Sequence, residues 1–257
     1  MEAGINLYSL RTLIGDEERF LKTALALRDM GYSSIQFSGA PYDAGVIKRV
    51  SERSGLPVVL THVPLDRILN DTDALMSEHD SFGCRIIGIG GIPAKPFLDE
   101  SELRGEFEKL DRAAAHMRAN GFEFSFHHHF AEMYKVDGKK TVLEFIVDNT
   151  ENVNITVDTY WLHYGGADVC AMLDRLAGRV KCLHLKDYQI KASTENGLSF
   201  TPAFAPVGKG TLDFPAIVEH AKKAGGIHFL VEQDDAVDYP DPLDQAKQSI
   251  DYIKECL

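Results

Sequence analysis

The sequence predicts an α/β fold of the (β/α)8 class, a closed barrel of parallel strands surrounded by helices. Short β-rich runs alternate with amphipathic stretches eight times along the chain, which is typical of βαβ units around a parallel sheet. The chain has 257 residues, close to the roughly 250 that such a barrel needs, so residues 1–257 are expected to form one domain. An open doubly wound sheet usually has a glycine-rich turn after its first strand, where this chain has Tyr8 to Arg11.

The predicted strands are rich in branched and aromatic residues, and each precedes a segment that can form a helix. They are Ile5–Ser9, Ser34–Phe37, Pro57–Thr61, Arg85–Ile89, Glu123–Phe126, Asn154–Val157, Val180–Leu185 and Phe229–Glu232.

Capping residues mark the ends of the predicted helices. Acidic residues at 16–18 open the first helix, where the helix dipole favours negative charge, and Gly31 closes it. A later helix begins near Ser101 and ends at Gly121, and Gly225 closes the helix before the last strand. The repeated pattern supports eight strand and helix units.

One long irregular stretch, roughly Tyr188 to Gly210, follows the seventh predicted strand. Loops of this length inside a compact domain are more often functional than accidental. We expect this stretch to form a lid or wall over an active site.

Composition excludes several classes of function. The 27 Lys and Arg against 39 Asp and Glu give a net charge of −12, which disfavours nucleic acid and anionic membranes as partners. The four cysteines, Cys84, Cys170, Cys182 and Cys256, are scattered and therefore expected to be reduced thiols. No secretory leader or long apolar span is apparent, so the protein is expected to be cytoplasmic.

Metal-competent side chains end four of the predicted strands. The active site of a (β/α)8 barrel lies at the carboxyl ends of its strands. In the run from Glu123 to His129, period-two alternation places His127 and His129 on a polar face opposite Phe124 and Phe126. At the ends of the next three strands, the same alternation predicts that four more side chains point inward: Asp158, His184, Lys186 and Glu232.

A single histidine or acid at a strand end is more often structural, bonding its neighbours or capping the next helix. When several such residues converge, a metal site becomes the better explanation, because burying two carboxylates together costs several kcal/mol unless a cation compensates. We therefore expect one divalent metal ion. Mixed oxygen and imidazole donors suit Mn, Co, Zn, Fe or Mg and do not select among them.

The chain resembles the xylose isomerase-like TIM barrels, the sugar phosphate isomerase/epimerase superfamily. The residues that carry the resemblance are 126–129 with Glu132, 157–161 with 165–168, 184–187, 206–210 and 231–234. The resemblance implies a metal held by His127, Asp158, His184 and Glu232. The isomerases and epimerases of that superfamily have a carboxylate where this chain has His127, so either the ligand set is altered or His129 or Glu132 substitutes.

Catalytic or substrate-binding roles are expected for several further side chains. We expect catalytic roles for His129, His62, Glu132 and Lys186, with His62 touching a substrate hydroxyl or moving a proton. Lys186 could stabilise an oxyanion or form a structural salt bridge. Substrate contacts are expected from Trp161, which could equally be a core residue, and from two others, His128 and Gln233.

These features predict an enzyme acting on a small carbohydrate with a carbonyl group. A metal-dependent isomerase or epimerase working through an enediolate is the first expectation. The alternative is a lyase or dehydratase of inosose or 3-keto-glycoside type, because paired-glutamate epimerisation machinery is incomplete here. A sugar-binding barrel without catalysis and an AP endonuclease are weaker alternatives, the latter disfavoured by the net charge. A homo-oligomer is compatible with the sequence.

Overall fold

The computed structural model of this chain describes residues 1–195 and 197–257 and contains a closed barrel of parallel strands. The prediction of a (β/α)8 TIM barrel is confirmed. Around the barrel the strands follow the order β1, β12, β9, β8, β5, β4, β3, β2. Their bounds are β1 Gly4–Asn6, β2 Ser34–Phe37, β3 Val58–His62, β4 Ile86–Ile89, β5 Glu123–His127, β8 Val153–Asp158, β9 Val180–Leu185 and β12 His228–Val231.

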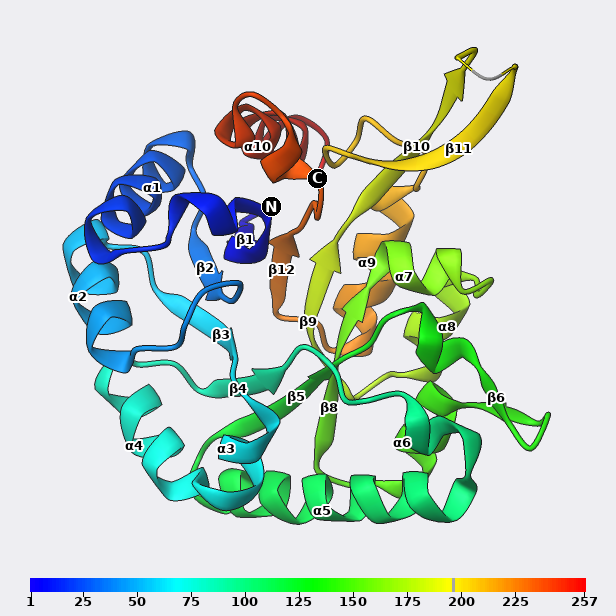
Figure 1. The fold of residues 1–257 in the computed structure, drawn as a ribbon. Helices are drawn as coiled ribbons and strands as arrows, with labels where there is room; N and C mark the ends of the chain where they lie inside the picture. Colours follow the sequence, from blue (N-terminus) through cyan, green and yellow to red (C-terminus); the bar gives the residue numbers. More distant parts are fainter. Residues whose placement is uncertain (196) are drawn as a thin grey trace.

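Helices surround the barrel and cover its outer face (Figure 1). The predicted capping residues act as expected: the side chain of Asp16 accepts from the backbone N–H of Arg19, and Gly31 ends that helix with φ 96°. The helices are α1 Glu17–Met30, α2 Ala44–Ser54, α3 Leu65–Asn70, α4 Thr72–Ser81, α5 Glu100–Ala119, α6 Val142–Asn149, α7 Thr159–Tyr164, α8 Val169–Arg175, α9 Phe214–Ala224 and α10 Pro242–Cys256.

Strand β5 shows how the sequence separates the core from the barrel interior. Its Phe124 and Phe126 are fully buried, and the Phe126 ring meets Phe107 of α5 at a centroid distance of 5.3 Å. The residues between them face the other way: Ser125 Oγ lies 2.7 Å from Thr156 Oγ1 inside the barrel. The predicted alternation therefore holds, and it carries the next inward residue, His127, toward the mouth.

The first strand is shorter than predicted. Strand β1 ends at Asn6, whose side chain accepts a hydrogen bond from the backbone N–H of Tyr8. That bond starts a short 3-10 helix, η1 Leu7–Leu13, so the expected strand over Ile5–Ser9 is wrong in its second half. The turn brings Asn6 and Tyr8 to the mouth of the barrel.

The stretch expected to be irregular is instead a regular β-ribbon. Strands β10 Asp187–Ser193 and β11 Ser199–Ala205 pair antiparallel and project away from the barrel (upper right of Figure 1). The returning chain is held at the base, where the Asp187 carboxylate accepts from the backbone N–H groups of Gly208 and Gly210. A side chain at Gly210 would overlap the carbonyl of Tyr188, so the close approach needs glycine.

Smaller elements complete the chain. The 3-10 turns η2 Lys95–Leu98, η3 Phe130–Met133 and η4 Ala236–Asp238 follow β4, β5 and β12, and strands β6 Lys135–Val136 and β7 Lys140–Thr141 form a short hairpin. Within the ranges given above, every helix is too short or too polar to span a lipid bilayer.

Candidate active site

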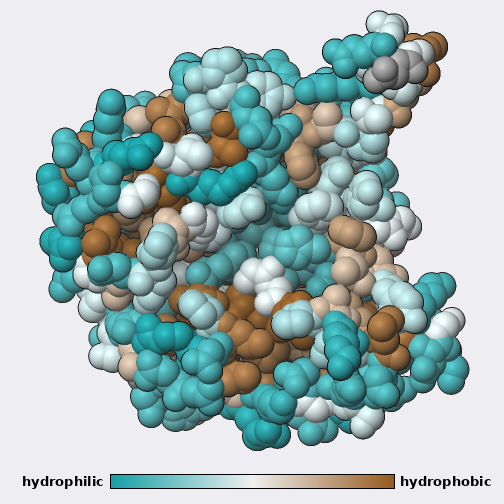
Figure 2. Space-filling model, viewed as in Figure 1, coloured by the Kyte–Doolittle hydropathy of each residue, from teal (hydrophilic) through white to brown (hydrophobic). Residues whose placement is uncertain are grey.

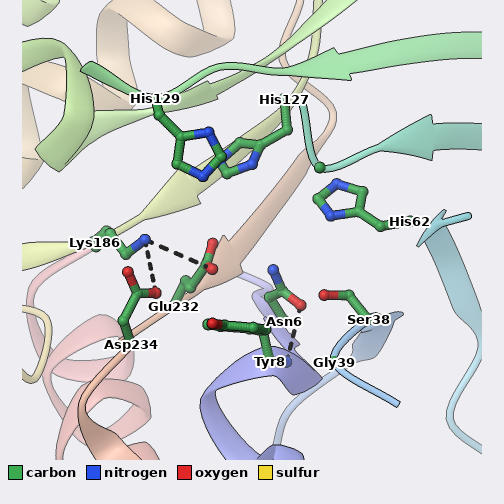
Figure 3. Close-up of a pocket in the computed structure, with 11 residues that line it drawn as sticks. Asn6, Tyr8, Ser38, Gly39, His62, His127, His129, Lys186, Glu232 and Asp234 are labelled. Carbon is green, nitrogen blue, oxygen red and sulfur yellow. Dashed lines mark hydrogen bonds and ion pairs between the residues drawn. The ribbon is translucent and has the colours of Figure 1, made fainter. Parts of the chain in front are cut away.

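A cavity of about 310 Å³ opens at the carboxyl ends of the barrel strands. Side chains from opposite sides of the barrel surround it (Figure 3), and hydrophilic residues gather at the centre of this face (Figure 2). Its lining consists of Asn6, Tyr8, Ser38, Gly39, His62, Gly90, His127, His129, Lys186, Glu232 and Asp234.

Four buried side chains converge at the floor of this mouth. His127 and Asp158 end β5 and β8, His184 lies in β9, and Glu232 directly follows β12. One potential ligand atom from each lies within 4.8 Å of the others. The His184 Nδ1 atom lies 2.5 Å from Glu232 Oε2 and 3.2 Å from His127 Nε2. The structure therefore brings together all four side chains that the sequence predicted as metal ligands.

Gln36 of β2 determines which nitrogen of His184 faces this cluster. Its Oε1 accepts from His184 Nε2–H at 2.7 Å, so Nδ1 is the nitrogen of His184 that faces the acids. Its Nε2 donates to His62 Nε2 at 3.0 Å. One amide thus sets the tautomers of two histidines, as the outer partners of metal-binding histidines do.

The donor set fits a divalent cation. Burial lowers the pKa of His127 well below its usual value and that of His62 to about 3, so both rings are neutral lone-pair donors near neutral pH. Among the described residues, Asp158 Oδ2 and Glu232 Oε2 are buried without a hydrogen-bond partner. These two buried carboxylate oxygens lack a hydrogen-bond donor in good geometry, so a cation bound beside them would offset the cost of burying their charge.

Lys186 supplies part of the compensating charge. Its Nζ lies 2.9 Å from Asp234 Oδ1, 3.2 Å from Asp158 Oδ2 and 3.6 Å from Glu232 Oε1. Burial would lower the pKa of Lys186, but the three carboxylates outweigh burial and raise it above its usual value. Three carboxyl groups therefore share one ammonium, which leaves the cluster with more acidic groups than cations. A divalent ion would neutralise that excess.

His129 stands between the metal-competent cluster and an aromatic wall. Its ring centroid lies 4.6 Å from that of His127 and 5.6 Å from that of Trp161. Burial lowers the pKa of His129, and the nearby Lys186 ammonium lowers it further. Trp161 lies beside the cavity lining, with Lys186 Nζ 5.0 Å from its ring centroid and Phe204 packed on it.

The structure does not bring His128 and Gln233 to the cavity. The His128 ring is fully buried, and its Nε2 accepts from the Asp158 backbone N–H at 3.1 Å. Gln233 donates to Asp235 and Gln245, on the far side of the strand end. Direct substrate contact by either residue does not fit this geometry, because strand alternation turns both away from the mouth.

Glu132 also lies outside the lining. Its Oε2 accepts from the backbone N–H of His129 at 2.8 Å and caps the 3-10 turn η3 after β5. Burial raises the pKa of Glu132 to about 7. In this position it supports the backbone of His129, and no contact with the four-residue cluster supports a ligand role.

Sequence reasoning missed several polar residues of the site. Asp234 is one of them, although it lies two residues after Glu232 and so shares its face by the same alternation that excludes Gln233. Gln36 was missed because its importance depends on partners in β3 and β9, far away in the chain. Tyr8 and Ser38 reach the mouth through turns, which alternation does not describe.

Known proteins resemble this chain along most of its length. It is 28% identical over 256 residues to the rhizopine catabolism protein MocC of Rhizobium meliloti, covering 86% of this chain and 76% of that protein. It is 29% identical over 254 residues to an inosose dehydratase of Clostridium perfringens, covering 91% and 80%.

Among solved structures, a sugar phosphate isomerase/epimerase from Parabacteroides distasonis superposes with a TM-score of 0.79 at 19% identity, covering 99% of this chain and 94% of that one. The model of one protein family, described as xylose isomerase-like TIM barrel, matches residues 24–256. The match spans all but the first strand of the barrel and includes the four converging side chains, His127, Asp158, His184 and Glu232. The chain belongs to the xylose isomerase-like TIM barrel family.

Proposed function

We propose that this protein is a metal-dependent dehydratase that removes water from a polyhydroxylated ketone of the inosose type. The observation that carries the proposal is the cluster of two carboxylates and two imidazoles beside a cavity that also presents His129, Lys186 and Asp234. This arrangement offers a cation site, a proton acceptor and a proton donor within one small volume.

His127, Asp158, His184 and Glu232 would hold the ion, with Gln36 orienting His184. A divalent ion bound there would act as a Lewis acid and stabilise negative charge that develops on the substrate. The small polar cavity suits a compact polyol, because Asn6, Tyr8 and Ser38 can exchange hydrogen bonds with its hydroxyl groups.

In the proposed first step, the neutral imidazole of His129 takes the proton from the carbon next to the carbonyl. The electron pair of the broken C–H bond forms a carbon–carbon double bond, and the carbonyl oxygen becomes anionic. The Lys186 ammonium, held at the mouth by three acids, stabilises negative charge on that oxygen. His62 faces the same space, but its Nε2 already accepts from Gln36, so its role is to contact a substrate hydroxyl and not to take the proton.

In the second step, the electron pair returns from the oxygen and expels the hydroxyl group on the next carbon. The leaving hydroxyl takes a proton and departs as water, and a new carbon–carbon double bond remains in the product. Asp234, with Lys186 Nζ 2.9 Å away, is the proposed donor, since burial raises the pKa of Asp234 to about 6.

Two observations favour dehydration over the isomerase or epimerase reaction that the sequence suggested first. A relative that aligns over 91% of this chain is an inosose dehydratase. The β5 position has His127 where the isomerases and epimerases have a carboxylate, so the pair of acids expected for epimerisation is incomplete here. Epimerisation shares the first proton transfer, and the assay below separates the two outcomes.

The test follows the substrate by NMR in D2O. The metal-loaded protein is expected to exchange the proton next to the carbonyl of an inosose and to form the dehydrated product. His129→Asn should abolish both while the ion stays bound, and His116→Asn, an exposed histidine of α5, should change neither. Exchange and metal both retained in His129→Asn would remove His129 from the mechanism. Epimerised substrate without water loss would replace dehydration by epimerisation.

A further inference from the structure

The β10–β11 ribbon has one apolar face along its whole length. Residues directly opposite each other in an antiparallel pair share a face. The register pairs on one face are Tyr188 with Phe204, Ile190 with Pro202, and Ala192 with Phe200. The pairs on the other face are Gln189 with Ala203, Lys191 with Thr201, and Ser193 with Ser199.

The base of this apolar face packs on its own barrel. The Tyr160 ring of α7 lies 4.8 Å from the Phe204 ring and 5.4 Å from the Tyr188 ring. The polar face is also tied to the body, because Lys191 Nζ donates to Tyr239 Oη at 3.2 Å. The orientation of the ribbon is therefore fixed at its base.

The outer part of the same face is exposed. Ile190 and Phe200 of this face are 51% and 65% exposed, and Leu198, in the bend just before β11, is 71% exposed. Figure 2 shows hydrophobic atoms at the outer end of the ribbon. In the part of the chain that the structure describes, β10 and β11 pair only with each other. A two-stranded ribbon is marginally stable alone, so a partner that covers this face would stabilise it.

A second apolar surface lies beside the base of the ribbon. Phe130 and Tyr134, in and after η3, and Tyr164, at the end of α7, are about half exposed. The Phe130 and Tyr164 rings meet at 5.4 Å, and Tyr164 stacks on Tyr160 at 5.4 Å. These three side chains, here called the aromatic rim, continue the apolar surface that begins on the ribbon.

We propose that the outer ribbon and the aromatic rim bind a second copy of this chain, in a symmetric dimer. In a two-fold dimer the same surface of each copy contacts the other copy, so that surface must be complementary to itself. One chain carries both a projecting apolar face and an apolar rim, which meets this requirement. The six half-exposed side chains offer roughly 100 Å² each, or about 600 Å² per copy, near the ~800 Å² per partner of stable complexes. All six are uncharged, so the contact is compatible with two copies that each carry a charge of −12.

The experiment measures mass in solution by sedimentation equilibrium. The wild-type chain at micromolar concentration should sediment with twice its mass of 28.5 kDa. Phe200→Lys and Ile190→Lys place a charge on the apolar face and should each raise the dimer dissociation constant about 30-fold or more. Ser199→Lys, one residue away on the polar face, is the matched control and should leave it unchanged.

Circular dichroism of each variant checks that the barrel is folded, so a lost dimer is not confused with a lost fold. A monomeric wild-type chain, or a Phe200→Lys variant that remains dimeric, would overturn the proposal. If the monomeric wild type co-sediments with phosphatidylcholine–phosphatidylserine vesicles, the face belongs to a membrane contact instead. Because the readout is mass, its failure is distinguishable from failure of the proposed dehydratase activity.

Discussion

Gln36 connects the two histidines that matter most to the geometry of the site. Its oxygen accepts from His184 and its nitrogen donates to His62, so each imidazole is held in one tautomer. A leucine of similar volume would leave both rings free to rotate and to exchange tautomers. Among the described residues, the Gln36 side chain hydrogen-bonds only these two histidines, and its role is therefore to position His184 and His62.

Gln36→Leu should weaken binding of Mn²⁺ about 10- to 100-fold, the range typical of lost outer partners. The measurement is calorimetric titration of the metal-stripped protein with Mn²⁺. Gln245→Leu removes another buried amide, one that bonds Gln233 away from the cavity, and is the matched control. Equal Mn²⁺ affinity in Gln36→Leu and wild type would show that the tautomer of His184 does not depend on Gln36.

Glu132 should make stability depend on pH. Its folded pKa of about 7 lies above the unfolded value of about 4.3, so the folded state holds the proton more tightly. The stabilising contribution is complete below about pH 4.3 and is lost as the pH rises through 7, at a cost of about 4 kcal/mol in unfolding free energy. Glu132→Gln keeps an oxygen for the His129 N–H and removes the titration.

The melting temperature of the wild type should therefore fall between pH 5 and pH 8 by more than that of Glu132→Gln. Thermal melts of both proteins at the two pH values check this. The side chain is 3% exposed, so the carboxylate cannot simply turn to water. Parallel pH profiles would mean that Glu132 ionises in the folded protein as easily as in the unfolded chain.

Among single residues, the sequence predicts those whose direction follows from the alternation of side chains along a strand. His127, Asp158, His184 and Glu232 were found because each lies at or near the end of a strand and faces inward. Side chains that act through partners on distant strands, or that reach the cavity through turns, carry no such signal. The triple histidine run illustrates the limit, because its middle member faces the backbone of Asp158.

At the scale of elements, the ribbon and its base depend on one carboxylate. Asp187 accepts from the backbone N–H groups of Tyr188, Gly208, Gly210 and Leu212. These bonds close the chain after β11 and hold the start of β10 next to Lys186. Charged acceptors with several N–H donors stabilise such turns by about 1.5–3 kcal/mol per bond at most.

Asp187→Asn should loosen the base of the ribbon, because an amide has one acceptor oxygen in place of two. Hydrogen exchange measured by mass spectrometry should show faster exchange at residues 206–212, with the barrel strands unchanged. Asp213→Asn alters the N-cap of α9 next to this turn and serves as the control. Unchanged protection at 206–212 in Asp187→Asn would assign the closure of the ribbon to its own strand pairing.

The strands of the barrel were predictable because buried parallel strands are rich in branched residues and lie between turn residues. Strands β2, Ser34–Phe37, and β9, Val180–Leu185, have the predicted bounds, and all the other barrel strands except β1 differ by one residue at one or both ends. The ribbon was not predicted because Pro202 and its polar neighbours resemble a loop, and proline is compatible with an edge strand. Its apolar face becomes visible only once the register is known.

At the scale of the whole molecule, charge and topology act together. The parallel barrel brings the carboxyl ends of all eight strands to one mouth, and that is why residues as distant as Asn6 and Asp234 share one cavity. A net charge of −12 makes nucleic acid an unfavourable partner, and that expectation stays a prediction. The local excess of acid at the mouth favours a cation.

The most direct test of this account is titration of metal-stripped protein with Mn²⁺, read by calorimetry and by elemental analysis after dialysis. The wild type is expected to bind one ion per chain. Glu232→Gln retains shape but removes a charge, and should weaken binding at least about 100-fold, while Glu219→Gln, exposed on α9, should not change it. A wild-type protein that binds no ion, or full occupancy retained in Glu232→Gln, would contradict the assignment of the four-residue cluster.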